Sequence, residues 1–168
     1  TDEIVDLMCE KGTWLVPTLS LFDGMATRGR DFGLPQQVID MAARKQERHV
    51  ASFQLALRAG VNIANGSDIG SSACAHGTGA RELSLLVQHG MTPMQAITTA
   101  TASSARMLGM EADIGTVQAG RLADLVVMDG DPLADIDILQ VRDRISAVMK
   151  SGKLTSPGNE FLSFSRAG

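Results

Sequence analysis

The segment at residues 60–68 (GVNIANGSD) constrains the fold of this chain more than any other part of the sequence. A short apolar strand ends there in a turn of small residues, and the turn delivers one carboxylate, that of Asp68. In α/β barrels the active site is assembled at the carboxyl ends of the strands, so a carboxylate directly after an apolar run is a candidate for chemistry rather than for packing. The pattern therefore favours an α/β fold with Asp68 at its functional edge.

The elements before this strand alternate as expected for a parallel sheet. A helix with an acidic first turn is predicted over residues 1–12, and a buried strand over residues 14–19. Residues 20–34 hold three glycines, two arginines and little periodicity, which predicts a long loop of the kind that shapes a binding site. A long helix is predicted over residues 35–60, opened by proline and ended by glycine. The order of helix, strand, helix, strand suits a parallel sheet.

Helical patterns follow Asp68. A loop of small residues reaches Gly79, and the next helix has an apolar face and ends at Gly90. Residues 92–95 (TPMQ) form a capping box with proline at the first helical position, which is a clear helix start. The helical run that begins there reaches Leu108.

The character of the sequence changes near Gly109. Residues 125–128 and 145–149 are short β-type runs bounded by Asp-Gly, Asp-Pro and Ser-Gly turns. These strands have no crossover helices between them. We therefore place a boundary near Gly109 and expect a small β-rich subdomain after it.

Composition and charge exclude several classes of function. The 168 residues suffice for one globular domain with a core, and 44% hydrophobic residues fit a soluble protein. The net charge is −4 and there is no basic run, which argues against nucleic-acid binding. No stretch approaches the roughly 20 apolar residues that cross a bilayer. We expect a soluble protein whose localisation is not determined by the sequence, with a slight preference for the cytoplasm.

The ends and the cysteines give two further expectations. The chain begins with Thr1 rather than Met, inside an expected helix, so we expect that the natural N-terminus is missing. Cys9 and Cys74 have neither a zinc-site spacing nor a partner motif, and both are interpreted as free thiols.

Three motifs in order give the chain a family resemblance. They are the segment at residues 60–68, the run ARELSLLVQHGMTPMQAI at residues 80–97 and the run GTVQAGRLADLVVMDGDP at residues 115–132. Together they resemble the C-terminal part of the metal-dependent amidohydrolase superfamily, in its imidazolonepropionase-like and prolidase-like branch. The resemblance implies an α/β fold in which residues 1–109 are the C-terminal portion of a TIM (β/α)8 barrel, its last two strand–helix units. Residues 110–168 would then supply strands of a small β-sandwich subdomain.

The same resemblance implies a catalytic role for Asp68. It falls on the aspartate at the end of the last barrel strand, which would ligate a metal, take a proton from the metal-bound water and later protonate the leaving amine. A divalent cation lowers the pKa of its bound water from 15.7 to about 7, and a nearby carboxylate can then accept the proton. The alternative is that Asp68 only caps the turn after the strand.

The remaining polar residues have weaker signals. His76 lies on the expected rim loop and is a candidate substrate contact or proton-transfer group, although an exposed histidine without a role is the alternative. His49, within a helix, and His89, at a helix C-terminus that favours an imidazolium, are interpreted as structural. Arg81 and Glu82 begin a helix, and an exposed charged pair is expected there.

The other metal ligands of the family, a His-x-His pair, a bridging lysine or glutamate and two later histidines, have no counterpart in this sequence. A catalytic zinc needs about three protein ligands. We therefore expect that one or two zinc ions bind the full-length parent but are not retained by this chain, which would be inactive alone. Two barrel strands leave open edges, so a homo-oligomer or the missing barrel portion is expected to cover them.

Two hypotheses about function follow. In the first, the chain is the C-terminal part of a hydrolase of amide or cyclic amide C–N bonds, with a small peptide-like substrate such as a dipeptide or an acyl-amino acid. In the second, it is a non-catalytic α/β chain that acts only through oligomeric assembly.

Overall fold

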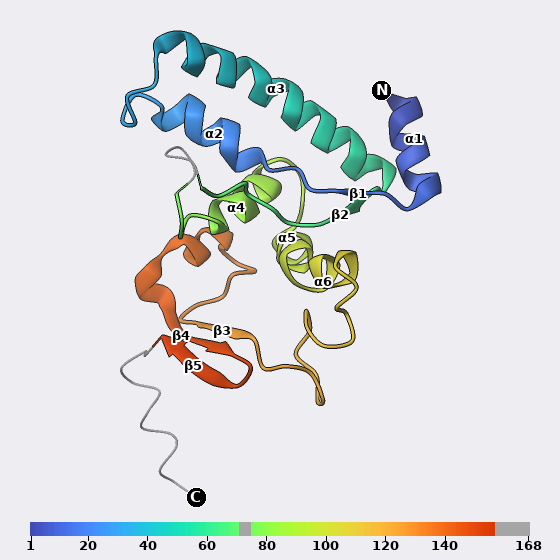
Figure 1. Cartoon of the computed structure of the whole chain (residues 1–168), viewed down its shortest axis with the longest axis vertical. Helices are drawn as coiled ribbons and strands as arrows, with labels where there is room; N and C mark the ends of the chain where they lie inside the picture. The colour runs from blue at the N-terminus through green and yellow to red at the C-terminus, as the bar shows by residue number, and fades with distance from the viewer. Residues whose placement is uncertain (71–74, 157–168) are drawn as a thin grey trace, which may run out of the picture.

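The computed structural model describes residues 1–70 and 75–156, and its secondary structure is mixed α/β (Figure 1). Cys74 lies outside the described residues, whereas Cys9 is an exposed free thiol. In chain order the elements are α1 (Asp2–Lys11), β1 (Trp14–Leu15), α2 (Leu19–Arg28), α3 (Gln36–Ala59), β2 (Asn62–Ile63), α4 (Ala80–Gln88), α5 (Pro93–Thr98), the π-helix η1 (Thr99–Ser103), α6 (Ser104–Met107), β3 (Leu125–Met128), the 3-10 helices η2 (Ile136–Gln140) and η3 (Arg142–Arg144), β4 (Ile145–Lys150) and β5 (Lys153–Ser156).

The two N-terminal strands form a parallel pair, as the alternation of elements predicted. Trp14 is opposite Asn62 and Leu15 is opposite Ile63, and the two helices α2 and α3 connect the strands. The predicted strand at residues 14–19 was too long, because pairing stops after Leu15. Pro17 has no N–H to donate, and Thr18 turns the backbone into the left-handed region with φ 50°.

The predicted loop at residues 20–34 was wrong over most of its length. Helix α2 occupies Leu19–Arg28 and packs along α3, as Figure 1 shows. Leu19 is 1% exposed and Ser20 is 3% exposed, so the start of this helix is part of the interior. The helix depends on burial and on a carboxylate from a distant segment, which local periodicity does not reveal.

The ends of α1 and α3 agree with the sequence analysis. Gly12 and Gly60 follow these helices with φ 63° and 80°, a left-handed conformation that glycine adopts without steric cost. The N–H of Gly60 and that of the next residue close the end of α3, and the chain enters β2 directly. The glycine therefore sets where the strand that leads to Asp68 begins.

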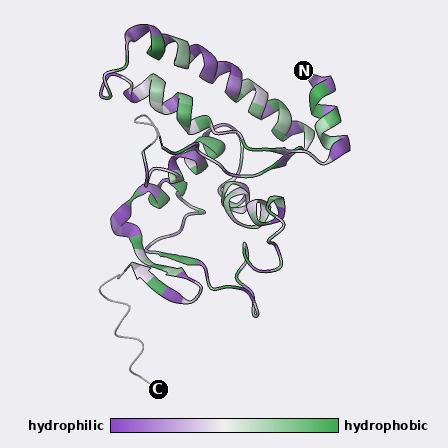
Figure 2. Ribbon diagram, viewed as in Figure 1, coloured by the Kyte–Doolittle hydropathy of each residue, from purple (hydrophilic) through white to green (hydrophobic). Residues whose placement is uncertain are grey.

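The core lies where α2, α3 and α4 meet the parallel pair. Figure 2 shows hydrophilic and hydrophobic residues alternating along α3, as expected for a helix that buries one face. The principal buried cluster contains Leu19, Phe53, Ile63, Leu83, Leu85, Leu86, Met91, Ala96 and Ile136. Its last member comes from η2, so the C-terminal segment packs against α4.

The predicted β-type runs are strands. β3, β4 and β5 form an antiparallel sheet in that order, with Leu125 opposite Met149. Asp124 supports the turn between β4 and β5, since it accepts from Lys150 Nζ at 2.6 Å and from the N–H of Ser151 at 2.7 Å. The hydrogen bond from Lys150 is the main cause that lowers the pKa of Asp124. The boundary near Gly109 stays a prediction.

The capping box at α5 is formed. Thr92 Oγ1 accepts from the N–H of Gln95 at 3.2 Å, and Gln95 Oε1 accepts from the N–H of Thr92 at 2.8 Å. We expect Thr92→Ala to lower the free energy of unfolding by about 1 kcal/mol in urea denaturation, because the N–H of residue 95 loses its acceptor. Thr98→Ala, which removes a hydroxyl bonded within the helix, is the control and should change stability by less than about 0.5 kcal/mol. Equal losses in the two variants would contradict the capping role.

No helix in residues 1–70 or 75–156 is long and apolar enough to span a membrane.

Candidate active site

Asp68 lies in the turn after β2, where its side chain is exposed. Its φ is 48°, and among the described residues the other non-glycine positions with positive φ are Thr18, after β1, and Ser151. Strained backbone of this kind is found at functional sites, where surrounding structure must hold it. Within the described residues the Asp68 carboxylate has no hydrogen-bond or ion-pair partner, so no capping contact is present there.

His76 lies on the loop between Asp68 and α4 and is exposed. The loop turns at Thr78, whose N–H and hydroxyl both bond to the carbonyl of Ala75, at 3.2 and 2.7 Å. At its end Gly79 lies close to the residues beside Asp68, because a Cβ there would be 3.1 Å from Ile69 Cδ1 and 3.6 Å from Ser67 Oγ. The C-terminal end of the loop that carries His76 is therefore close to the segment that carries Asp68.

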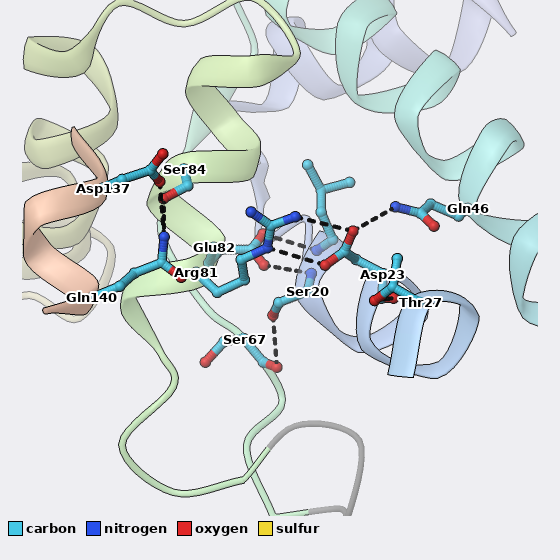
Figure 3. A network of polar contacts seen from close by, with 11 residues as sticks. Ser20, Asp23, Thr27, Gln46, Ser67, Arg81, Glu82, Ser84, Asp137 and Gln140 are labelled. Carbon is cyan, nitrogen blue, oxygen red and sulfur yellow. Dashed lines mark hydrogen bonds and ion pairs between the residues drawn. The ribbon is translucent and has the colours of Figure 1, made fainter. Parts of the chain in front are cut away.

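Glu82 was missed by the sequence analysis, which expected it in an exposed charged pair. It is instead 0% exposed, and its carboxylate accepts from the N–H of Leu19 at 2.8 Å and from the N–H of Ser20 at 2.7 Å (Figure 3). These are donors in the first turn of α2, so a side chain from α4 caps α2. Burial raises the pKa of Glu82, and the hydrogen bonds from Ser20 and Leu19 oppose the shift.

Arg81 is likewise not a free surface charge. It contacts Asp23 through Nε at 3.1 Å and Nη2 at 3.3 Å, and Gln46 donates to the same carboxylate at 3.3 Å. Figure 3 shows the Asp23 carboxylate between these two side chains. The Asp23–Arg81 ion pair connects α2 to α4, and the hydrogen bond from Gln46 connects α3 to the same carboxylate.

We expect Arg81→Ala to lower the free energy of unfolding by about 1–3 kcal/mol, because the nearly buried Asp23 would lose its cation. The matched control is Arg144→Ala, whose ion pair with Asp129 is exposed on both sides and should contribute about 0–1 kcal/mol. Thermal or urea unfolding of the two variants tests the difference. A loss for Arg81→Ala no larger than for the control would contradict the interpretation.

The turn before Asp68 is held from two sides. Ser20 Oγ donates to the carbonyl of Ser67 at 3.2 Å, which links α2 to the residue directly before Asp68. On the other side, the N–H of Asn65 donates to the carbonyl of Thr99 at 3.1 Å. This carbonyl belongs to the first residue of the π-helix η1 and also accepts from Ser104 Oγ at 2.6 Å.

The two helical histidines do not reach this region. His49 stacks edge-to-face on Phe22, and burial lowers its pKa. Burial also lowers the pKa of His89, with Arg81 adding to the shift and Asp23 opposing it. The expected preference of the helix C-terminus for an imidazolium is therefore outweighed by burial at His89.

The described residues do not by themselves fit a metal ion. No group of three or more His, Cys, Asp or Glu side chains suited to a metal is found among them. A catalytic zinc keeps about three protein ligands, and Asp68 is a single carboxylate. Ligands from elsewhere would be needed.

Residues 1–155 match the model of the amidohydrolase family. The chain belongs to this family. It is 34% identical over 156 residues to ochratoxinase of Aspergillus niger, and 35% identical over 104 residues to imidazolonepropionase of Rubrobacter xylanophilus. These alignments cover 91% and 61% of the chain, but only 31% and 25% of the two relatives. The chain thus spans about a third or less of the length of these amidohydrolases.

Solved structures agree with this family. A Xaa-Pro dipeptidase with methionine bound in its active site superposes with a TM-score of 0.79 at 35% identity, covering 92% of this chain and 37% of that one. A prolidase in complex with N-methylphosphonate-L-proline superposes with a TM-score of 0.83 at 30% identity, covering 94% and 38%. The mixed α/β fold described above is therefore that of one part of such an enzyme.

Proposed function

We propose that this chain contributes Asp68 to the active site of a hydrolase that cleaves amide or cyclic amide C–N bonds. The observation that carries the proposal is the position of Asp68, in the segment that follows the parallel strand β2 (Asn62–Ile63), in a chain of the amidohydrolase family. In parallel α/β folds this edge of the sheet is where functional side chains gather. Residues 1–109 would be the last two strand–helix units of the barrel, and residues 110–168 would supply strands of a small β-sandwich.

Amide hydrolysis needs a group that takes a proton from the attacking water and returns it to the leaving amine. Asp68 suits this role because its carboxylate is exposed and has no partner among the described residues. His76, on the loop between Asp68 and α4, would contact the substrate or assist proton transfer. The exposed side chains of Asp68 and His76 could both form hydrogen bonds with a small peptide-like substrate.

The family's chemistry calls for one or two divalent metal ions such as zinc, with Asp68 as one ligand. Because the donors in the described part of the chain do not fit such an ion, the remaining ligands would come from a segment that this chain does not contain. The isolated chain would then be inactive. The same segment, or a second copy of the chain, would cover the open edges of the β1–β2 pair.

A dipeptide or an acyl-amino acid is the proposed substrate, in line with the names of the dipeptidase and prolidase relatives. The test is hydrolysis by the full-length protein, loaded with zinc, of Xaa-Pro dipeptides, N-acyl-amino acids and a cyclic amide, followed by release of the free amine. Amine release from one of these classes, with none from this chain alone, is the expected result. A full-length protein that hydrolyses none of them and forms a stable metal-free oligomer would favour the assembly hypothesis instead.

A further inference from the structure

We propose that Glu82 and Ser20 are positioning residues for Asp68, joined in a buried relay that fixes the backbone of the turn after β2. The inference rests on the proposed function for its catalytic consequence, but its structural part concerns only contacts within this chain. Neither residue is exposed enough to touch a substrate, since Glu82 is 0% and Ser20 is 3% exposed. They would act through Asp68.

The first step of the relay fixes the start of α2. Both carboxylate oxygens of Glu82 are used, one by the N–H of Leu19 and the other by the N–H of Ser20. A carboxylate bound by two backbone donors at a helix N-terminus is stabilised by the aligned peptide dipoles. The cap of α2 is therefore a buried carboxylate from α4 and not a serine or threonine next to α2 in the sequence. This contact fixes the start of α2 against α4.

The second step of the relay is a hydrogen bond that connects the start of α2 to the turn before Asp68. The hydroxyl of Ser20 donates to the carbonyl of Ser67 at 3.2 Å and also contacts the Glu82 side chain. In Figure 3 Ser20 extends from the start of α2 toward Ser67. Because the carbonyl of Ser67 belongs to the peptide that leads into Asp68, this bond restricts the ψ angle of Ser67 and with it the direction of the Asp68 side chain.

The relay matters because Asp68 has a left-handed backbone conformation, which aspartate adopts more readily than most residues but which still lies above the ordinary negative-φ conformations in energy. A non-glycine residue at φ 48° costs of order 1–3 kcal/mol unless its surroundings impose it. The bond from Asn65 to Thr99 holds the near side of the turn, and Ser20 holds the peptide next to Asp68. Loss of the Ser20 bond removes one restraint on the peptide that leads into Asp68, which would let the turn relax toward ordinary φ values and redirect the carboxylate.

Ser20→Ala is the informative variant, because Glu82→Ala removes both caps of α2 and can prevent folding. The alanine leaves the N–H bonds to Glu82 intact and deletes only the hydroxyl. Ser52→Ala, which removes a hydroxyl bonded to the Arg48 carbonyl on the surface of α3, is the control. Two quantities are measured in the full-length protein: kcat and KM for the best amide substrate, and amide hydrogen exchange in residues 67–70.

Misplacement of a reacting group by about 1 Å can cost about 100-fold in rate. Ser20→Ala should therefore lower kcat by about 10- to 100-fold with KM within about twofold, and should speed exchange in residues 67–70 but not in α3. Ser52→Ala should match the wild type in both. Exchange and kcat of Ser20→Ala equal to those of Ser52→Ala would overturn the relay. If the wild type hydrolyses no amide, the proposed function fails, and the exchange measurement still decides whether Ser20 holds the turn.

Discussion

Glu82→Ala is expected to lower the free energy of unfolding by about 2–6 kcal/mol, because two buried N–H groups lose their acceptor at about 1–3 kcal/mol each. The donors are those of Leu19 and Ser20 in the first turn of α2. Urea denaturation followed by circular dichroism measures the loss. Glu47→Ala on the exposed side of α3 is the control and should stay within about 0.5 kcal/mol of the wild type.

The variant Glu82→Gln keeps the shape of the side chain but removes its charge, and so tests the contribution of the charge alone. The amide retains one acceptor but presents an NH2 group to the second N–H, so an intermediate loss is expected at neutral pH. The pKa of Glu82 is raised in the folded state, so the folded protein binds this proton more tightly than the unfolded chain does. The contribution of Glu82 to stability is therefore greatest below pH 4.5, the ordinary pKa of a glutamate carboxyl, and falls as pH rises through the window between 4.5 and the raised pKa.

The stability advantage of the wild type over Glu82→Gln should accordingly shrink as pH rises through that window. A Glu82→Ala variant as stable as the Glu47→Ala control would contradict the capping role. If the wild type instead became more stable relative to Glu82→Gln as pH rises through the same window, the pKa of Glu82 would not be raised by burial in the folded state.

Asp68→Asn is expected to have the opposite profile, with a large loss of activity and little change in stability. Removing a general acid–base group lowers the rate by about 10²- to 10⁴-fold. The exposed asparagine tolerates the positive φ of this position, so the free energy of unfolding of the metal-free protein should change by less than about 0.5 kcal/mol. The measurements are amide hydrolysis by the zinc-loaded full-length protein and urea unfolding of the same protein after metal removal.

The matched control for this prediction is Asp6→Asn, at an exposed position on α1. It removes the same charge and should retain full activity. If Asp68→Asn keeps activity within about twofold of Asp6→Asn, Asp68 is not the group that moves the proton.

Local signals predicted much of the fold. Gly12 and Gly60 fix the ends of two helices because a left-handed residue is needed there, and the Thr92–Gln95 box is a reciprocal contact within one turn. The alternation of helices and strands indicated a parallel pair, and β1 and β2 are parallel. Each of these features depends on residues that are close in sequence.

The part that could not be predicted depends on contacts between distant segments. Helix α2 starts at residues whose N–H groups are capped by Glu82, more than 60 positions later in the chain. One signal was present: Glu82 lies three and four residues before Leu85 and Leu86, on the buried face of α4. A charged residue in that register indicates a paired, buried group rather than a solvated one.

The candidate site was only partly accessible to sequence reasoning. The position of Asp68 after a strand was predicted from the turn residues, and its role stays a prediction. The network that holds this turn was missed, because Ser20 and Thr99 become its neighbours only through the tertiary fold. Its positive φ was also missed, although aspartate is one of the residue types that adopt the left-handed conformation more often than most.

The central claim is that Asp68 is one ligand of a metal site whose other ligands lie outside this chain. Elemental analysis of zinc, after dialysis, in the purified 168-residue chain and in the full-length protein tests it most directly. We predict well under one zinc ion per copy of this chain, about one or two per copy of the full-length protein, and a reduced content in full-length Asp68→Asn. About one or two tightly bound zinc ions in the 168-residue chain alone would contradict the account.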